Sequence, residues 1–573
     1  MTSGFSYRFG PFRLDAGGRL LFRGGQRLAL SPKAVELLLA LVEAQPNPVG
    51  KEQLLNRVWA ETAVEEGSLT THISLLRKTI GEQYIETLSK RGYRFVGEVK
   101  QVGEEAGERP PIRSLAVLPL ENLGHDPDGD SFGDSMTEAL ITNLAKISAL
   151  RVVSRTSVMR YKDTQKSLPE IGKELSVDAL VEGSVQREGD RVRINARLVV
   201  AAADRHLWAE AYDRDLRDVL ILQDEVARTI AKEIQVKLTP EEHTRLSSGR
   251  PVDPYAYQLY IKGRYFWVKR TEESFNRAIA YFQQAIERDP SYAAAYSGLA
   301  DCYSSLGFSF DVGSQRPMDV QPKAKSAALT AIALDDSLAE AHTSLAYVKL
   351  NYEWDWPAAE AEFRRSLELN PGYAHGHHWY AHLLLSSGRV NEALAESQRA
   401  LELDQLSPIM NLHLGWHYLY SRQYDLALDQ LAKTVELEPN YGLTYWYLGL
   451  VYEQKGMYVE ALKEMGSAKD FLKSNLTVDA DMGRVYALSG RRSEADKAIA
   501  RLKKESSRRY VNPYQIGLIY VGLGQNDQAF EWLDKAVGER SDMLVYLKTD
   551  SRLNPIRSDS RFPEIEQRVG IPP

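Results

Sequence analysis

The 573-residue chain has little cysteine, and it has no long run of apolar residues. Its only cysteine, Cys302, excludes an intramolecular disulfide and any zinc site built from several thiolates. A lone thiol also suits a reducing cytoplasm. No stretch approaches the roughly 18 consecutive apolar residues of a membrane-spanning helix, and the opening residues lack the basic and apolar regions of a signal peptide. We therefore expect a soluble cytoplasmic protein without a membrane segment.

Basic residues are fewer than acidic residues in the whole chain, and the two kinds are unevenly distributed along it. The whole chain has a net charge of −7. Residues 1–100 contain 14 Lys and Arg against 10 Asp and Glu, whereas the remaining residues contain 57 against 68. The net charge is therefore +4 for residues 1–100 and −11 for residues 101–573. The first hundred residues can bind nucleic acid even though the whole chain is acidic. The length also predicts several domains, since one hydrophobic core rarely serves more than about 300 residues.

An internal repeat of 34 residues runs through the second half of the chain. Small residues recur at this interval in two linked series. The first series is Ala381, Gly415, Gly449, Gly483 and Gly517, and the second is Ala359, Ala393, Ala427, Ala461, Ala495 and Ala529. Helices cross closely only where side chains are small, so the pattern predicts stacked helix pairs. It resembles the tetratricopeptide repeat family, with about eight pairs over residues 255–540 and a helical cap over residues 541–573.

The first hundred residues combine a small predicted sheet with three predicted helices. Ser31 and Pro32 form a start signal for the first helix, and the next two are expected over residues 51–59 and 66–80. The third helix has one apolar face, made by Leu69, Ile73, Leu76 and Ile80. This spacing predicts that one side of the helix is buried and that the other is exposed.

A two-stranded hairpin with a basic tip is predicted after the third helix. Strands are expected over residues 84–88 and 93–96, around the turn Ser89-Lys90-Arg91-Gly92. This hairpin, together with the segment His72-Ile73-Ser74-Leu75-Leu76-Arg77-Lys78, resembles the winged-helix output domain of OmpR/PhoB-type response regulators and their CadC/ToxR-like relatives. The resemblance covers residues 5–98. It implies that the third helix enters the major groove of double-stranded DNA and that the hairpin reaches an adjacent minor groove.

The same resemblance implies a set of DNA-contacting residues. Thr70, Thr71 and Ser74 are expected at base edges, and the basic residues at phosphates. The full predicted set is Thr70, Thr71, His72, Ser74, Arg77, Lys78, Lys90, Arg91 and Tyr93. Ser74 and Leu75 stand where the family often has basic residues, so the favoured DNA sequence does not transfer. The alternative that Arg77 and Lys78 form only a solvated helix face stays open.

Residues 112–240 alternate predicted strands and helices, as in an α/β domain. A linker is expected over residues 101–111, because this stretch is rich in glycine, proline and charge. Residues 186–191 and 206–210 resemble a TolB amino-terminal-like module, which has no agreed chemistry. Asp134 and Glu138 are expected to cap or flank a helix. The predicted fold class is multidomain, with an α+β winged helix-turn-helix at residues 1–100, an α/β middle domain and an all-α tetratricopeptide-repeat solenoid.

The first helices of the repeat pairs are expected to line a concave groove with aromatic and histidine side chains. We predict that this groove binds a protein, a peptide or a small ligand. Its residues are His375, His378, His382, Trp416, Tyr420 and Trp446. His378 and His382 are four residues apart, a spacing that can share a metal ion. Histidines in such repeats more often pack or face water, so we predict no metal and no cofactor.

These patterns favour a transcription regulator that binds DNA through residues 1–100 and receives its signal through the repeats. We expect a homodimer on repeated half-sites, with RNA polymerase as a further partner. The main alternative is an interaction scaffold whose winged helix binds protein rather than DNA. An enzyme is the third option, but no nucleophile elbow, phosphate loop or metal-binding carboxylate pair supports it, so we predict no catalysis.

Overall fold

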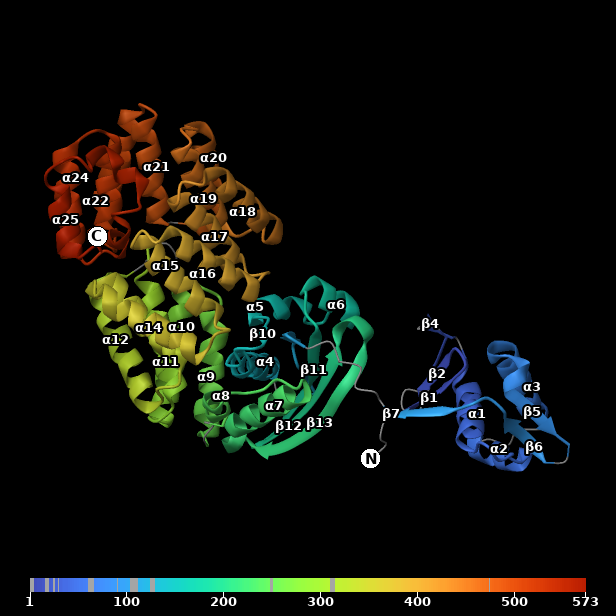
Figure 1. Cartoon of the computed structure of the whole chain (residues 1–573). Coiled ribbons are helices and arrows are strands. Elements are labelled where there is room, and N and C mark those ends of the chain that lie inside the picture. Colours follow the sequence, from blue (N-terminus) through green and yellow to red (C-terminus); the bar gives the residue numbers. More distant parts are fainter. Residues whose placement is uncertain are drawn as a thin grey trace. The chain divides into compact units, whose positions relative to one another are not determined.

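The computed structural model describes the chain except for residues 1–4, 16–19, 24–25, 29, 60–65, 90, 104–111, 124–128, 248–250, 310–314, 474 and 573. The chain forms two compact units, Met1–Pro111 and Ile112–Pro573 (Figure 1). Within the described part, no helix is both long and apolar enough to cross a membrane.

The first unit combines three helices with a five-stranded antiparallel sheet and a separate hairpin. The sheet order is β4-β3-β2-β1-β7, and β5 pairs with β6 in the hairpin. Ser31 begins the first helix as predicted, because its hydroxyl oxygen accepts the N–H of Ala34 at 3.3 Å. The predicted apolar face of the third helix is buried in the core of this unit. The elements are β1 (Phe5–Phe9), β2 (Phe12–Asp15), β3 (Leu20–Arg23), β4 (Gln26–Arg27), α1 (Pro32–Glu43), α2 (Lys51–Val58), α3 (Glu66–Ile80), β5 (Ile85–Leu88), β6 (Gly92–Phe95) and β7 (Lys100–Gly103).

The linker after this unit begins later than predicted. Residues Lys100–Gly103 form β7, which pairs antiparallel with β1 at the edge of the sheet. The prediction that an unpacked linker begins at residue 101 was therefore wrong. Backbone hydrogen bonds to a neighbouring strand do not need apolar side chains, so the polar composition concealed the strand. Residues 104–111 lie outside the described part of the chain.

The second unit begins with a mixed sheet of order β10-β8-β11-β12-β13, and β9 pairs with β11 beside this path. The pairs among β8, β10 and β11 are parallel, while β11, β12 and β13 form an antiparallel meander. Along β12, Val192 and Ile194 are buried and Arg191 and Arg193 are exposed, so one face of the sheet meets the core and the other meets water. Helices α4 and α7 contribute to this core. The elements are β8 (Ser114–Val117), β9 (Glu121–Asn122), α4 (Gly129–Ala145), β10 (Arg151–Val152), α5 (Arg155–Val158), α6 (Leu168–Glu174), β11 (Ala179–Glu188), β12 (Arg191–Val200), β13 (Arg205–Asp215), α7 (Val219–Glu233) and α8 (Pro240–Arg245).

Helices in successive pairs follow this middle block, coloured from green to red in Figure 1. The small residues of the 34-residue repeat lie where helices cross. A Cβ atom at Gly415 would lie 2.9 Å from Leu431, and one at Gly449 would lie 2.5 Å from Met465. The first helices of the pairs are α9 (Pro254–Trp267), α11 (Ala293–Leu306), α13 (Ala339–Val348), α15 (Ala374–Ser386), α17 (Pro408–Tyr420), α19 (Gly442–Gln454), α21 (Leu476–Leu488) and α23 (Pro513–Gly522). The second helices are α10 (Glu272–Arg288), α12 (Pro317–Leu334), α14 (Trp356–Leu369), α16 (Val390–Leu403), α18 (Tyr424–Leu437), α20 (Tyr458–Leu472), α22 (Arg492–Glu505) and α24 (Asn526–Gly538).

The middle block and the first helices of the repeat array share one hydrophobic cluster. Residues of α9, among them Ala256 and Tyr257, belong to the same buried cluster as α4 and α7. Hydrogen bonds cross the same boundary, because the Ser157 hydroxyl donates to Asp404 at 2.7 Å. The composition predicts a break near residue 240, but the packing is continuous there.

The tail of the chain, residues 541–572, contacts more of the array than the predicted end cap would. Its elements are the short 3-10 helices η6 (Asp542–Tyr546) and η7 (Ser551–Ile556) and the helix α25 (Phe562–Val569). Helix α25 packs on α24, while η6 contacts α15, four pairs earlier in the array. The tail turns back because five consecutive residues, Met543 to Leu547, are apolar and buried among the repeats. The predicted cap therefore corresponds to α25 alone, while the segment before it lies among the repeats.

Candidate nucleic-acid interface and ligand cavity

Helix α3 presents an exposed polar face in the first unit. Thr70, Thr71 and Ser74 are exposed, and so is Lys78 one turn later. Leu75 on the same helix is 42% exposed, which is high for a large apolar side chain. Hydroxyl groups hydrogen-bond to base edges in the major groove, and apolar groups contact the methyl group of thymine. The face that the sequence predicts for DNA is therefore accessible and has suitable chemistry.

Arg77 fixes the hairpin against α3. Its Nε and Nη2 atoms donate to the carbonyl oxygen of Ile85 at 3.0 and 2.8 Å, and Nη2 also donates to the Thr87 hydroxyl at 2.7 Å. These bonds hold the guanidinium within the domain, so Arg77 positions the hairpin rather than acting mainly on a phosphate as predicted. At the hairpin, Gly92 has φ +99°, and a Cβ atom there would lie 2.1 Å from the carbonyl oxygen of Val49. Glycine is the residue that fits this close approach.

Two further members of the predicted DNA-contacting set lie in the domain interior. Tyr93 is 4% exposed, because alternation along β6 turns its side chain to the core together with Phe95. The prediction that Tyr93 contacts DNA was therefore wrong. His72 is half-buried and packs edge-on against Trp59, with ring centroids 5.2 Å apart. Arg91 is exposed at the hairpin turn, and Lys90 lies outside the described residues.

The predicted groove of the repeats is filled by the tail of the same chain. The hydroxyl of Tyr546 lies 2.9 Å from Nδ1 of His382, and the Arg552 guanidinium donates to the Tyr420 hydroxyl at 3.0 Å. The predicted groove residues that are buried are His378, His382, Trp416, Tyr420 and Trp446. His375 keeps partial exposure. The prediction that these side chains line an open groove was wrong, because all but His375 are buried, and the tail contacts His382, Trp416 and Tyr420 directly.

Three histidines meet inside this filled groove. Nε2 of His382 lies 3.2 Å from Nε2 of His378 and 2.9 Å from Nδ1 of His413. Burial, together with neighbouring imidazoles, lowers the pKa of all three rings well below the usual histidine value. Sequence reasoning missed His413. The sequence feature that could have revealed it is a second pair of histidines four residues apart, His413 and His417, in α17.

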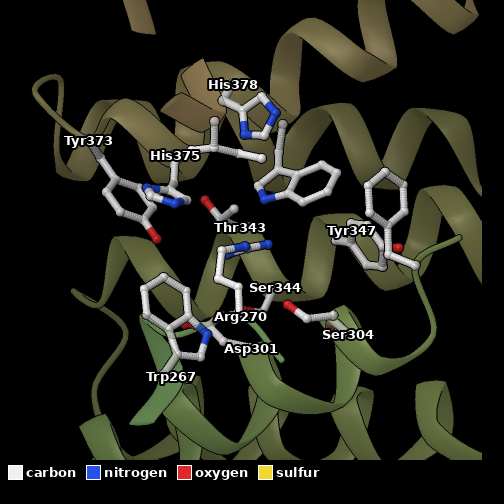
Figure 2. A pocket seen from close by; sticks show the side chains of 14 residues that line it. Trp267, Arg270, Asp301, Ser304, Thr343, Ser344, Tyr347, Tyr373, His375 and His378 are labelled. Carbon is white, nitrogen blue, oxygen red and sulfur yellow. Dashed lines mark hydrogen bonds between the residues drawn. The ribbon is translucent and has the colours of Figure 1, made fainter. Parts of the chain in front are cut away.

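A cavity of about 290 Å³ lies between the middle block and the first repeats. We call it the central cavity; its walls come mainly from α4, α9, α11 and the start of α15. A second cavity of about 40 Å³, the small cavity, shares Trp267, Tyr373 and His375 with it. Figure 2 shows the small cavity, with Trp267 and Asp301 on one side and His375 and His378 on the other. His375 is thus the one predicted groove residue that lines the central cavity.

Partly buried charged residues form an ion-pair network beside the two cavities: Glu138, Arg155 and Arg264 line the central cavity and Asp301 lines the small cavity. Arg264 pairs with Glu138 and lies 3.8 Å from Asp301, and Arg155 lies 3.6 Å from Glu138. Burial raises the pKa of Asp301 to about 6 against the opposing effect of Arg264. Burial also acts on Glu138, but the two guanidiniums outweigh it and lower the pKa of that carboxyl. Glu138, expected to cap or flank a helix, serves this ion-pair network, and Asp134 pairs with Lys162 at 2.9 Å.

Several polar atoms in the wall of the central cavity have no hydrogen-bond partner among the described residues. They are Nε1 of Trp267, Oγ of Ser297 and Nε of Arg264. Trp267 is 8% exposed and Ser297 is 4% exposed, so bulk water does not readily satisfy them. An unsatisfied buried donor costs roughly 1–3 kcal/mol, which a ligand or a bound water can recover. The wall is therefore suited to a small molecule that carries hydrogen-bond acceptors.

Known protein families match the three regions of the chain. The model described as "Transcriptional regulatory protein, C terminal" matches residues 25–95, and "HilA/YgeH-like transcriptional regulator, second domain" matches residues 112–229. Tetratricopeptide repeat models match residues 270–307, 412–469 and 514–542. The transcriptional regulator HilA of Salmonella typhimurium is 24% identical over 570 residues, which cover 97% of this chain and 99% of HilA. The chain is homologous to the transcriptional regulators HilA and CadC and contains a domain that matches the transcriptional regulatory protein model.

Two other relatives match parts of this HilA- and CadC-like regulator. The transcriptional activator CadC of Escherichia coli is 28% identical over 118 residues, which cover 20% of this chain and 23% of CadC. A Rhizobium meliloti protein named as an adenylate cyclase is 40% identical over 197 residues, which are 34% of each chain. The regulator therefore spans about a third of that protein. The middle block matches the HilA second domain, and the TolB-like resemblance stays a prediction.

Proposed function

We propose that this HilA- and CadC-like regulator binds promoter DNA through α3 and the hairpin, and that a small molecule in the central cavity provides its signal. The exposed face of α3 is the observation that supports DNA binding. Its hydroxyl groups are accessible beside a hairpin that Arg77 holds in place. In winged-helix domains this helix enters the major groove.

Different residues on this face have different roles in the proposal. Thr70, Thr71 and Ser74 contact base edges, while Lys78 and Arg91 neutralise phosphates. The balance of +4 in residues 1–100 gives one copy few phosphate contacts. We therefore propose that a homodimer binds repeated half-sites, and that RNA polymerase is a further partner at the promoter. Such a protein acts in the cytoplasm, where bacterial DNA lies.

Selection of bound DNA by the full-length protein over a salt series tests this assignment. Ser74→Ala should relax the selected sequence at one position, because it removes a base contact. Lys78→Ala should weaken binding to all sequences and lower the salt slope by about 1. Lys504→Ala removes an exposed charge from the repeats and is the matched control. If the wild-type protein enriches no sequence, the DNA assignment fails and the scaffold alternative replaces it.

The signal part of the proposal rests on the central cavity. Its volume of about 290 Å³ is near the lower end for small-molecule sites, which begin at roughly 300 Å³. Its unpartnered atoms are mostly N–H donors, so we propose a ligand with carboxylate or phosphate oxygens. Because the cavity lies between the middle block and the repeats, a ligand there contacts both parts of the second unit.

A thermal-shift screen of small carboxylates and phosphates against the full-length protein tests the cavity. Trp267→Phe removes the indole N–H while it keeps most of the packing, and it should abolish the shift of any ligand that binds there. Trp532→Phe in α24 is the matched control and should leave the shift unchanged. A ligand whose shift survives Trp267→Phe binds elsewhere, and that result rejects the cavity as the input site. We propose that the protein itself catalyses no reaction, and that cyclase activity belongs to the R. meliloti relative alone.

A further inference from the structure

We infer that His378, His382 and His413 form a binding site for one divalent transition-metal ion of the zinc type. The three side chains come from two consecutive first helices, α15 and α17. Each offers one ring nitrogen, and the three atoms all lie within 4.8 Å of one another. This is the one such group of three ligands found within the described residues.

The spacing of the ring nitrogens fits a metal ion. Zinc binds imidazole nitrogen at 2.0–2.1 Å in a tetrahedral arrangement, which places two ligand nitrogens about 3.3 Å apart. The observed separations from Nε2 of His382 are 3.2 Å to His378 and 2.9 Å to His413. Both separations from His382 are within a few tenths of an ångström of the value that a shared ion requires.

The surroundings of His382 match the outer shell of a metal site. A histidine that binds metal through one ring nitrogen usually hydrogen-bonds through the other, and this bond fixes the ring. Nδ1 of His382 lies 2.9 Å from the hydroxyl of Tyr546 in the tail. Tyr546 is therefore a positioning residue for the proposed site. The ion would join the two repeats to the docked tail.

Three imidazoles leave one tetrahedral position open. His378 lines the small cavity, whose volume of about 40 Å³ exceeds the roughly 10–15 Å³ that a water molecule needs. Arg270 lines the same cavity, and its positive charge repels the proposed metal ion unless an anion lies nearby. We therefore assign the fourth position to an anionic oxygen, such as hydroxide, which lowers the net charge. Three histidines and one oxygen is a ligand set that zinc accepts.

Zinc binding to the full-length protein tests this site directly. The purified chain is treated with a chelator and desalted, titrated with zinc chloride, and analysed for bound metal by mass spectrometry. His378→Gln and His413→Gln each remove one ligand. His377→Gln is the matched control, since this neighbouring histidine on the same helix bonds Glu396 and the carbonyl of Pro371 instead. Circular dichroism verifies that each variant is folded.

We expect one zinc per chain in the wild type and in His377→Gln, and affinity weaker by at least about 100-fold in the other two variants. Tyr546→Phe keeps all three ligands and should weaken zinc binding by about 10- to 100-fold, with cobalt absorption in the visible range still present. A folded wild type that binds no zinc overturns the proposal, and the three rings are then held by hydrogen bonds to one another and to Tyr546. Zinc binding that survives both His378→Gln and His413→Gln overturns it as well, because the metal then sits elsewhere.

Discussion

Replacing Arg552 with methionine tests whether the tail fills the groove of the repeats. Arg552 is 4% exposed and lies on the tail. Its guanidinium bonds Asp550 at 2.8 Å, Asp481 of α21 at 3.2 Å and the Tyr420 hydroxyl at 3.0 Å. Methionine has a similar length but no charge, so it removes the ion pairs and leaves two buried carboxylates without their cation.

The expected loss of stability is large. Removing one partner of a buried ion pair destabilises a protein by about 3–5 kcal/mol, because the remaining charge stays buried. With a urea slope near 3 kcal/mol per molar, this corresponds to a midpoint lowered by about 1–2 M. Urea unfolding followed by tryptophan fluorescence measures the change, since Trp416 and Trp446 lie beside this network.

The loss should also depend on pH. Burial raises the pKa of Asp481 to about 6 even though Arg552 opposes the shift, and burial of Asp550 is outweighed by Arg552, which lowers that pKa. Without Arg552, the folded-state pKa of both carboxyls rises. A group with a raised folded-state pKa stabilises the fold at low pH, and this contribution disappears as the pH rises through that pKa. The variant should therefore differ most from the wild type at pH 7.5 and least near pH 5.

Arg568→Met is the matched control for this prediction. It makes the same substitution in the same tail, but Arg568 is exposed and pairs with Asp534 on the surface of α24. Surface ion pairs contribute little, so its urea midpoint should stay close to that of the wild type. If Arg552→Met is as stable as Arg568→Met at pH 7.5, the tail is not docked and the repeat groove is open.

Three further predictions follow from other parts of the structure. Arg91→Ala should weaken binding to all DNA sequences alike and lower the salt slope by about 1, and a sequence-dependent effect would show that Arg91 contacts bases instead. Gly92→Ala should destabilise the first unit by about 1–3 kcal/mol, because the new Cβ atom meets the carbonyl oxygen of Val49, and hydrogen exchange in residues 85–95 should speed up while the repeats keep their rates. Burial raises the pKa of Asp542 from 3.8 to about 6, so this carboxyl costs about 2 kcal/mol of stability as the pH rises from 4 to 8. Asp542→Asn should flatten that part of the urea-stability profile, and an unchanged slope would contradict the assigned pKa.

Much of the first unit could be predicted from local patterns. Ser31 caps α1 because a hydroxyl beside a proline satisfies the free N–H groups of a helix start. The 4, 3, 4 spacing from Leu69 to Ile80 fixed both faces of α3. The DNA contacts predicted for Arg77 and Tyr93 were wrong because the hairpin folds back on α3. This packing gives Arg77 a partner in Ile85 and places Tyr93 in the domain core.

The candidate site in the second unit could be predicted only in part. The histidine and aromatic content of the first helices was visible in the sequence, and so was the spacing of His378 and His382. The burial of these residues was not, because it depends on a tail that follows them by more than 150 residues. His413 joins the cluster only when two repeats stack. Glu138 and Arg264 likewise meet across 126 residues of sequence.

The sequence by itself therefore determined most of the elements, their order, and the families that the first unit and the repeats resemble. It did so because helix caps, apolar spacing and a 34-residue repeat act between residues that are close along the chain. The tertiary structure alone decided that the middle block shares a cluster with the first helices of the array, that the tail fills the groove and that three histidines converge. These features depend on which apolar surfaces find each other once the elements have formed, and burial of such surfaces is not directional. A local pattern can show that a side chain must be buried, whereas the fold decides what buries it.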